Sequence, residues 1–415
     1  MTQGSLISFQ NRVENPFIIV KIGDYTFGHC RPIDRAKLQT LKLSYPNFLT
    51  GLSIRKVNGA VNTYTIKMVY AIRETDDPNL LERVFSSISA SRTIYISYGD
   101  WTLPQYEYKE EEALLTKVSS SVDFNNSKIE YTLTATSNAL SLTAGYEDFE
   151  AKKIKPSDEI KRLIRSEQYG LKQLFTGMSL MDDAQLNTLI AGDDQEVELK
   201  AQKCTVLDYI NYLVSCMTFE GDKATEDLKN SRYFWATYDD INNDYGGMYF
   251  KVIRIAANAK YNLGYNAYEI DVGYPSGNLV SNFTVDNNES WAILYNYSKQ
   301  IDLPSYTYDI DDKGKITSTY SPAITKSYKY GTTVEASKSW WSNMTQYPIS
   351  AKITIKGLLK PAILMSYLKV NTYFYGHKHI SSGLYIITKQ EDQIDSSGYR
   401  TTLSITRISG DEMGE

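Results

Sequence analysis

The sequence has little of several features that mark common classes of protein. Its 415 residues include only three cysteines (Cys30, Cys204 and Cys216), which form no CxxC pair, so neither a disulfide framework nor a zinc ribbon is indicated. Lys and Arg number 44 against 49 Asp and Glu, and a dedicated nucleic-acid-clamping protein would show a basic surplus instead. No basic segment followed by an apolar stretch opens the chain, so no secretion signal is visible. The longest apolar stretch near a helix, Tyr209 to Phe219, is far shorter than the roughly 20 residues of a membrane span.

Motifs of catalysis and of cofactor binding are also missing. The sequence contains no GxSxG, HExxH, GxxxxGK[ST] or GxGxxG motif, and its only histidines are His29, His377 and His379. Carboxylates are abundant enough for a glycoside-cleaving pair, but the sequence singles out no pair. We therefore predict neither catalytic residues nor a cofactor.

A weak candidate for metal binding is the pair His377 and His379. Residues two apart on a strand point to the same face, so these imidazoles could share a metal, and a threefold axis would supply six ligands. A polar strand end beside Gly376 is the simpler interpretation. Two calcium-like loops, Asp240–Asp244 and Asp309–Gly314, lack required ligands and are interpreted as solvated hairpin tips. The aromatic groups Trp340-Trp341 and Tyr373-Phe374-Tyr375 fit a sugar platform, an interface anchor or core packing.

The 34 tyrosines and many threonines favour β structure. Alternating apolar residues from Tyr64 to Ile72 predict a strand with one buried face. A helix is expected from Asp77 to Ile88, because Asp77 is a plausible N-cap and Pro78 suits the first helical position. Further strands are predicted at Thr93–Tyr98, and at Leu115–Phe124 and Ile129–Thr136 around a tight turn.

The pattern changes after Ala144, and a mixed α/β region is expected over residues 151–265. Ser157 is a candidate cap of one helix, and Thr205 with Asp208 begins a second helix that reaches Met217. A hairpin pairs Tyr233-Phe234-Trp235 with Met248–Ile255. From residue 266 onward the sequence is again strand-like, with strands expected at Leu384–Thr388 and Thr401–Ile408. We therefore predict three domains, over residues 1–150, 151–265 and 266–415.

The first and last regions contain a possible internal repeat. Thr132-Leu133-Thr134-Ala135-Thr136 aligns with Thr402-Leu403-Ser404-Ile405-Thr406 at an offset of 270 residues (402 − 132), and both follow a turn. Restricted β composition also produces such matches by chance, so duplication and coincidence both stay open.

The C-terminal region resembles a known family. The segments Leu359-Lys360-Pro361, Leu368–Phe374, Gly383–Ile387 and Gly398-Tyr399-Arg400-Thr401-Thr402-Leu403 resemble the C-terminal barrel of tail hub proteins, the baseplate hubs and tail-associated proteins of bacteriophages and related injection systems. The family pattern is a glycine, a tyrosine-containing strand, a turn and a strand of the form G-[YF]-x-T-x-L. Gln390-Glu391-Asp392 departs from it, because many members carry a histidine after the preceding strand.

The resemblance implies a β-rich α+β fold in which two tandem tail-tube-like antiparallel β-barrels flank a smaller mixed α/β domain. It also implies a structural, non-enzymatic virion component, made in the host cytoplasm, that forms a homotrimeric pseudo-sixfold ring. Such a ring joins a hexameric tail tube to a trimeric spike or tail-tip protein, contacts the tape measure protein and lets DNA pass. The alternatives are a carbohydrate-binding protein of the tail tip and a cell-wall hydrolase.

Overall fold

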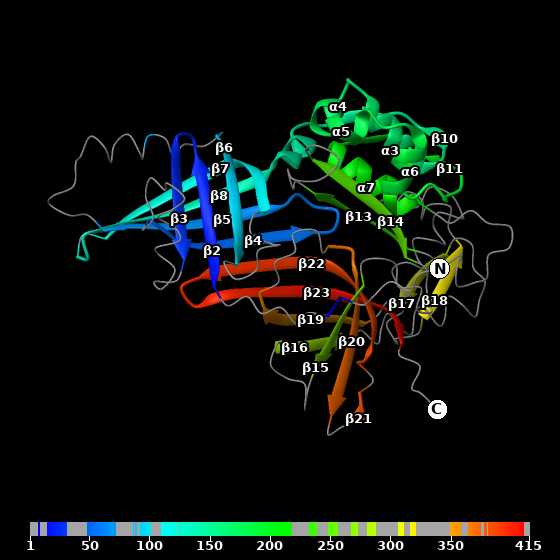
Figure 1. The fold of residues 1–415 in the computed structure, drawn as a ribbon. Helices are drawn as coiled ribbons and strands as arrows, with labels where there is room; N and C mark the ends of the chain where they lie inside the picture. Colours follow the sequence, from blue (N-terminus) through cyan, green and yellow to red (C-terminus); the bar gives the residue numbers. More distant parts are fainter. Residues whose placement is uncertain are drawn as a thin grey trace.

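The computed structural model describes residues 7–8, 15–30, 48–71, 86, 88, 92–100, 109–123, 125–217, 232–238, 248–255, 267–272, 280–287, 306–310, 316–320, 349–357, 364–374, 377–379 and 381–410. Most of these residues lie in antiparallel strands, which confirms the β-rich character expected from composition. A single 15-stranded sheet follows the order β1-β15-β20-β22-β4-β5-β8-β7-β6-β2-β3, and β16, β19, β21 and β23 are attached beside this path (Figure 1). Strands from both ends of the sequence therefore belong to one sheet.

The strands form two sets that follow the chain, except that β1 near the N-terminus pairs with β15 and belongs to the C-terminal set. The N-terminal strand set comprises β2 (Pro16–Ile22), β3 (Tyr25–Cys30), β4 (Leu49–Val57), β5 (Thr63–Ala71), β6 (Thr93–Asp100), β7 (Lys109–Asp123) and β8 (Lys128–Ser137). The C-terminal strand set comprises β1 (Ile7–Ser8), β15 (Ala267–Val272), β16 (Val280–Asn287), β19 (Ile349–Lys356), β20 (Tyr367–Phe374), β21 (His377–Lys378), β22 (Gly383–Asp395) and β23 (Gly398–Gly410). A separate hairpin pairs β17 (Tyr306–Ile310) with β18 (Ile316–Tyr320).

A helical region stands between the two sets in the sequence (Figure 1). It contains η3 (Asn138–Thr143), α3 (Pro156–Arg165), α4 (Leu171–Leu174), α5 (Thr176–Ser179), α6 (Asp183–Leu189) and α7 (Val206–Cys216). Its short strands are β9 (Glu147–Phe149), β10 (Lys152–Ile154), β11 (Val197–Leu199), β12 (Gln202–Cys204), β13 (Arg232–Tyr238) and β14 (Tyr249–Ile255). The ring of Phe149 stacks on that of Tyr209 with centroids 3.7 Å apart, which fixes α7 against β9.

The helix starts test the predicted caps. Thr205 caps α7 as expected, because its hydroxyl accepts a hydrogen bond from the amide of Asp208 at 3.1 Å. The predicted cap at Ser157 is wrong, since α3 already begins at Pro156, where the missing N–H costs nothing. The amide of Ser157 donates instead to Asp194, at 2.9 Å. The helix expected from Asp77 to Ile88 lies outside the described residues except for Ser86 and the buried Ile88.

The strand predictions are confirmed where the structure describes them, and Ile72 and Phe124 lie outside the described residues. Tyr64, Ile66, Met68 and Tyr70 are all buried on one face of β5, as the alternation required. Both expected hairpins form: β7 pairs with β8, and β13 with β14.

The two strand sets share one strand order. The sequence β4-β5-β8-β7-β6 in the first set corresponds to β16-β19-β23-β22-β20 in the second, and every neighbouring pair in both runs is antiparallel. Registers correspond as well, because Leu133 faces Ile66 across β8 and β5 while Leu403 faces Ile353 across β23 and β19. The offset seen between Thr132–Thr136 and Thr402–Thr406 thus aligns equivalent positions of two similar strand arrangements.

Two bulges recur at equivalent places and favour duplication over coincidence. Thr116 interrupts the β7–β8 register and its hydroxyl donates to the carbonyl of Thr134 at 3.0 Å, while Thr388 interrupts β22–β23 and donates to the carbonyl of Ser404 at 3.2 Å. The equivalent bulge on the other flank has Thr50 donating to Lys67 in the first set. In the second set Ser281 donates to Thr354. A bulge changes the direction of its strand locally. Because each of these bulges carries a hydroxyl residue at the equivalent position, the strands of both sets bend in the same places.

Candidate functional site

The site that this fold builds is the junction where the two strand sets meet. The first half of β22, Gly383–Ile386, pairs with β20 of its own set, and the second half, Lys389–Asp395, pairs antiparallel with β4 of the other set. One strand thus belongs to both halves of the sheet. The junction joins residues more than 300 positions apart in the chain, and it makes the N-terminal and C-terminal strand sets parts of one sheet.

Apolar side chains close the inward face of the junction. Ile394 pairs with Leu52, and both are at most 2% exposed. The ring of Tyr399 lies edge-on to Tyr98 with centroids 6.5 Å apart. Both Ile394 and Tyr399 belong to the hydrophobic core of the N-terminal strand set, so the tip of the β22–β23 hairpin completes that core.

A buried carboxylate lies at the centre of the inward face. The side chain of Glu111 on β7 is fully buried and receives Lys56 Nζ at 2.6 Å. The hydroxyls of Tyr64 and Tyr98 each donate to the same carboxylate, also at 2.6 Å. Burial, followed by the adjacent charge of Glu111, raises the pKa of Tyr98 well above its ordinary value. Three donors on three strands satisfy a charge that would be costly in the core without them.

A second buried carboxylate, Asp392, faces this cluster from β22. It accepts hydrogen bonds from Gln390 and Thr401, each at 2.6 Å, and it also interacts with the hydroxyl of Tyr399. Burial raises the pKa of Asp392 to about 6, while the hydrogen bond from Thr401 and the charge of Lys56 oppose that rise. We name Lys56, Glu111 and Asp392, with their partners Tyr64, Tyr98, Gln390, Tyr399 and Thr401, the junction cluster.

The outward face of the same strands is mostly polar. Short hydroxyl residues alternate there with charges of both signs, and the half-buried Val57 and Val69 lie among them. The residues concerned are Ser53, Arg55, Thr65, Lys67, Lys117, Ser119, Ser121, Glu130, Thr132, Ser350, Lys352, Thr354, Glu391, Gln393, Arg400, Thr402 and Ser404. Such a surface presents hydrogen-bonding groups without an adhesive apolar patch.

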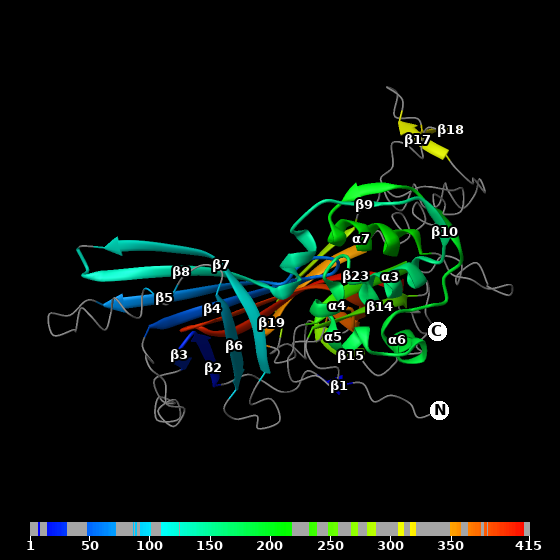
Figure 2. The ribbon, with the colours of Figure 1, turned by 90° about the horizontal axis from the view of Figure 1, so that it is seen from above.

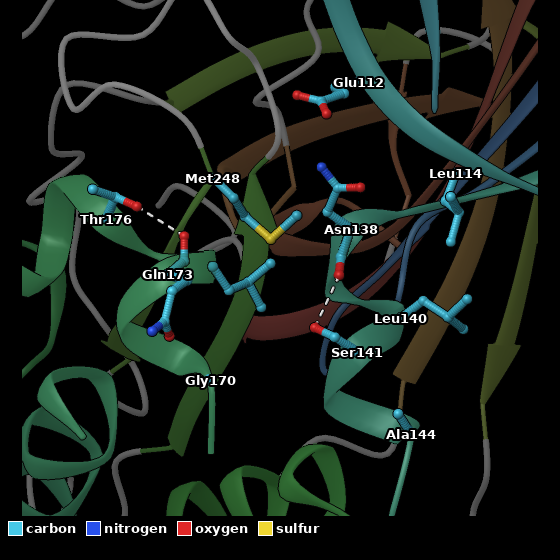
Figure 3. A pocket seen from close by; sticks show the side chains of 11 residues that line it. Glu112, Leu114, Asn138, Leu140, Ser141, Ala144, Gly170, Gln173, Thr176 and Met248 are labelled. Carbon is cyan, nitrogen blue, oxygen red and sulfur yellow. Dashed lines mark hydrogen bonds between the residues drawn. The ribbon is translucent and has the colours of Figure 1, made fainter. Parts of the chain in front are cut away.

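A cavity of about 720 Å³ lies between η3 and the helices α4 and α5 (Figure 3). Leu114, Leu140 and Met248 supply much of its apolar wall. The hydroxyls of Ser141 and Thr176 donate to backbone carbonyls of their own turns, at 3.1 Å and 2.8 Å. Its polar lining residues include Glu112, Asn138 and Gln173, and it holds neither histidine nor cysteine.

The residues singled out from the sequence lie away from the junction or outside the described residues. His377 and His379 are both exposed, and His379 Nδ1 lies 2.8 Å from Ser381 Oγ. No group of three or more His, Cys, Asp or Glu capable of holding a metal occurs in the described part of one chain. Ligation by several copies stays a prediction. Residues 240–247, 311–315 and Trp340-Trp341 are among those that the structure does not describe.

The junction cluster was not found from the sequence. Lys56 has the sequence context of an ordinary surface lysine. Glu111 lies in the acidic run Glu110-Glu111-Glu112, and because all three residues are acidic, the sequence does not show which of them is buried. The available signal was Gln390-Glu391-Asp392, the departure from the tail hub pattern, because two of its three residues are buried here.

No helix among the described residues is long and apolar enough to cross a membrane.

Comparison with known proteins finds matches among solved structures only. No family model matches the chain, and no curated protein matches it. A tail protein from Neisseria meningitidis MC58 has a TM-score of 0.48 and 8% identity, over 95% of this chain and 97% of that one. The 43 kDa tail protein of prophage MuSo2 from Shewanella oneidensis has a TM-score of 0.49 and 12% identity, over 94% and 96%.

A third similar structure is an E. coli component of the type VI secretion system, described as similar to the bacteriophage T4 tail proteins gp27 and gp5. Its TM-score is 0.44 at 8% identity, over 90% of this chain and 77% of that one. Two of these three structures are described as tail proteins and the third as a component of a secretion system.

Proposed function

We propose that the chain is a structural hub protein of a phage tail, in which three copies form a ring of six similar β domains. The two domains of each copy would comprise residues 1–150 and 266–415, with residues 151–265 between them as a mixed α/β domain. The ring would join a hexameric tail tube to a trimeric spike or tail tip, contact the tape measure protein and let DNA pass.

The observation that carries this proposal is the head-to-tail junction inside one chain. The two strand sets share their strand order and two bulges, and β4 of one pairs with β22 of the other. Such a junction uses different surfaces on its two sides, and heterologous contacts of this kind build closed rings when the rotation closes. Three chains with two similar domains each supply six positions.

The polar outward face supports passage of a polymer through the ring. Its serines and threonines bind water readily, and Glu130 and Glu391 lie among more numerous basic residues. The basic excess attracts a polyanion, and the hydroxyl residues between the charges keep that attraction weaker than on a surface of clustered lysine and arginine.

The test is the assembled mass and symmetry of the protein. Sedimentation equilibrium is expected to give three chains of 47.2 kDa, alone or together with tube and spike proteins. Electron-microscopy class averages are expected to show a ring with six similar lobes. A protein that stays monomeric alone and with these partners would contradict the proposal, and so would a ring with two- or fourfold symmetry.

A further inference from the structure

Two strand edges remain open when the chain is described by itself. β16 pairs with β19 on one side, and the Lys117–Asp123 half of β7 pairs with β8 on one side. In the described part of the chain neither has a strand on its other side. The β7–β8 hairpin reaches away from the rest of the molecule (Figure 2), so its edge is accessible.

These two edges are the counterparts of the two edges that meet inside the chain. The bulges at Thr116 and Thr388 make the Lys117–Asp123 half of β7 equivalent to the Lys389–Asp395 half of β22. The bulges at Thr50 and Ser281 likewise make β16 equivalent to β4. Each strand set therefore has one β4-type edge and one β22-type edge. Within the chain, β4 pairs with β22, while β16 and the Lys117–Asp123 half of β7 stay open.

The exposed apolar residues mark the same edges. Val122 is 48% exposed, and it occupies the position of Ile394, which is 1% exposed at the junction. Val285 is 40% exposed, and it occupies the position of Ile54, which is fully buried. Phe283, the counterpart of Leu52, is partly buried beside the core. Large apolar side chains exposed along an open strand edge indicate a partner strand.

We propose that β16 of one copy pairs antiparallel with the Lys117–Asp123 half of β7 of a second copy of this chain. The register follows that of β4 on β22 and places Val122 opposite Phe283, and Ser121 opposite Thr284. This inference rests on the proposed ring and names the contact that closes it. The partner is fixed as a second copy because the chain already contains the same junction once, with its two edges on different strand sets.

The geometry allows a direct covalent test. The amide of Asn58 donates to the carbonyl of Thr388 at 2.9 Å, which makes the outward pairs of the internal junction, such as Ser53 with Gln393, non-hydrogen-bonded pairs. By equivalence Ser121 and Thr284 form such a pair between copies. Their Cβ atoms would then be close enough for a disulfide.

The experiment oxidises the variant Ser121→Cys/Thr284→Cys in the assembled protein and analyses it on a denaturing, non-reducing gel. Covalent dimers and trimers that disappear on reduction are expected. The matched control is Ser121→Cys/Val285→Cys, one residue out of register, whose second thiol points to the opposite face. Each single-cysteine variant measures the background from the native thiols.

The outcomes separate this inference from the proposed function. If the protein has the mass of a trimer but the in-register variant cross-links no better than its control, this pairing is wrong and the ring stands. If the protein is monomeric with all partners, both fail.

A non-covalent measurement keeps the inference testable without cysteines. Val122→Lys is expected to weaken self-association by roughly tenfold or more, since a buried apolar contact is lost. Leu180→Lys, at a residue 78% exposed in the helical region, is the control and is expected to leave self-association unchanged. Equal effects of both substitutions would overturn the inference.

Discussion

The two strand sets have similar backbones, but their equivalent positions carry very different side chains. Glu111 in the first set corresponds to Gly383 in the second, Tyr64 to Ala351, and Lys56 to Asn287. The junction cluster therefore exists only where β22 meets the first set. The comparison teaches that shared geometry is maintained by bulges and register, whereas buried charge distinguishes the internal junction from the open edges.

The largest expected effect comes from removing the carboxylate that the second set lacks. Glu111→Ala leaves Lys56 and two tyrosine hydroxyls buried without their acceptor, and we expect a loss of about 3–5 kcal/mol in the free energy of unfolding. Urea denaturation monitored by circular dichroism measures it. The double variant Lys56→Met/Glu111→Leu is the control and should recover most of the stability, because it removes both charges. A loss below 1 kcal/mol in Glu111→Ala would show that the cluster does not hold the junction.

Asp392 gives the next effect, as a dependence of stability on pH. Its pKa of about 6 in the folded protein is above the ordinary value of 3.8, so the native state binds the extra proton and is stabilised at low pH. That contribution is full below pH 4 and is lost as pH rises through 6, by up to about 3 kcal/mol.

Asp392→Asn should therefore gain stability relative to the native protein between pH 4.5 and pH 7.5. Ser120, the counterpart of Asp392 in the N-terminal strand set, is exposed. Ser120→Asn is therefore the control, and its stability relative to the native protein should not change with pH. A stability difference that does not change with pH would contradict the assignment.

A smaller effect is expected at Gly357, the counterpart of Tyr70. A Cβ atom there would overlap the ring of Tyr399, whose hairpin tip fills this space. We expect Gly357→Ala to cost about 1–3 kcal/mol through overpacking. Thermal unfolding should show it, and Gly145→Ala, where a Cβ meets nothing within 4 Å, is the control.

The smallest effect tests whether the two bulges are equivalent. Thr116→Val and Thr388→Val each remove one hydrogen bond to a carbonyl across the hairpin, at a cost of about 1 kcal/mol each. Chemical denaturation should give similar values for the two variants. A loss in the free energy of unfolding for one variant and none for the other would show that the two bulges are not equivalent.

Local pattern predicted much of this fold. Alternation in Tyr64–Tyr70 predicted the buried face of β5, and the polar turns around Asn126 and Ser397 lie between β7 and β8 and between β22 and β23. The junction could not be predicted in the same way, since pairing of β4 with β22 is a contact between distant segments and leaves no periodic signal. The bulge residues Thr116 and Thr388 look like ordinary polar positions of a strand, because a bulge shifts the alternation by a single residue.

The division of β22 between two neighbours has a mechanical consequence. Its first half is held by β20, its second half by β4, and its full length by β23. A load that separates the N-terminal and C-terminal strand sets cannot act on an interface alone, since it must tear a continuous strand out of the layer to which it belongs. Within the described strands, the two sets would therefore carry tension together as parts of one continuous sheet.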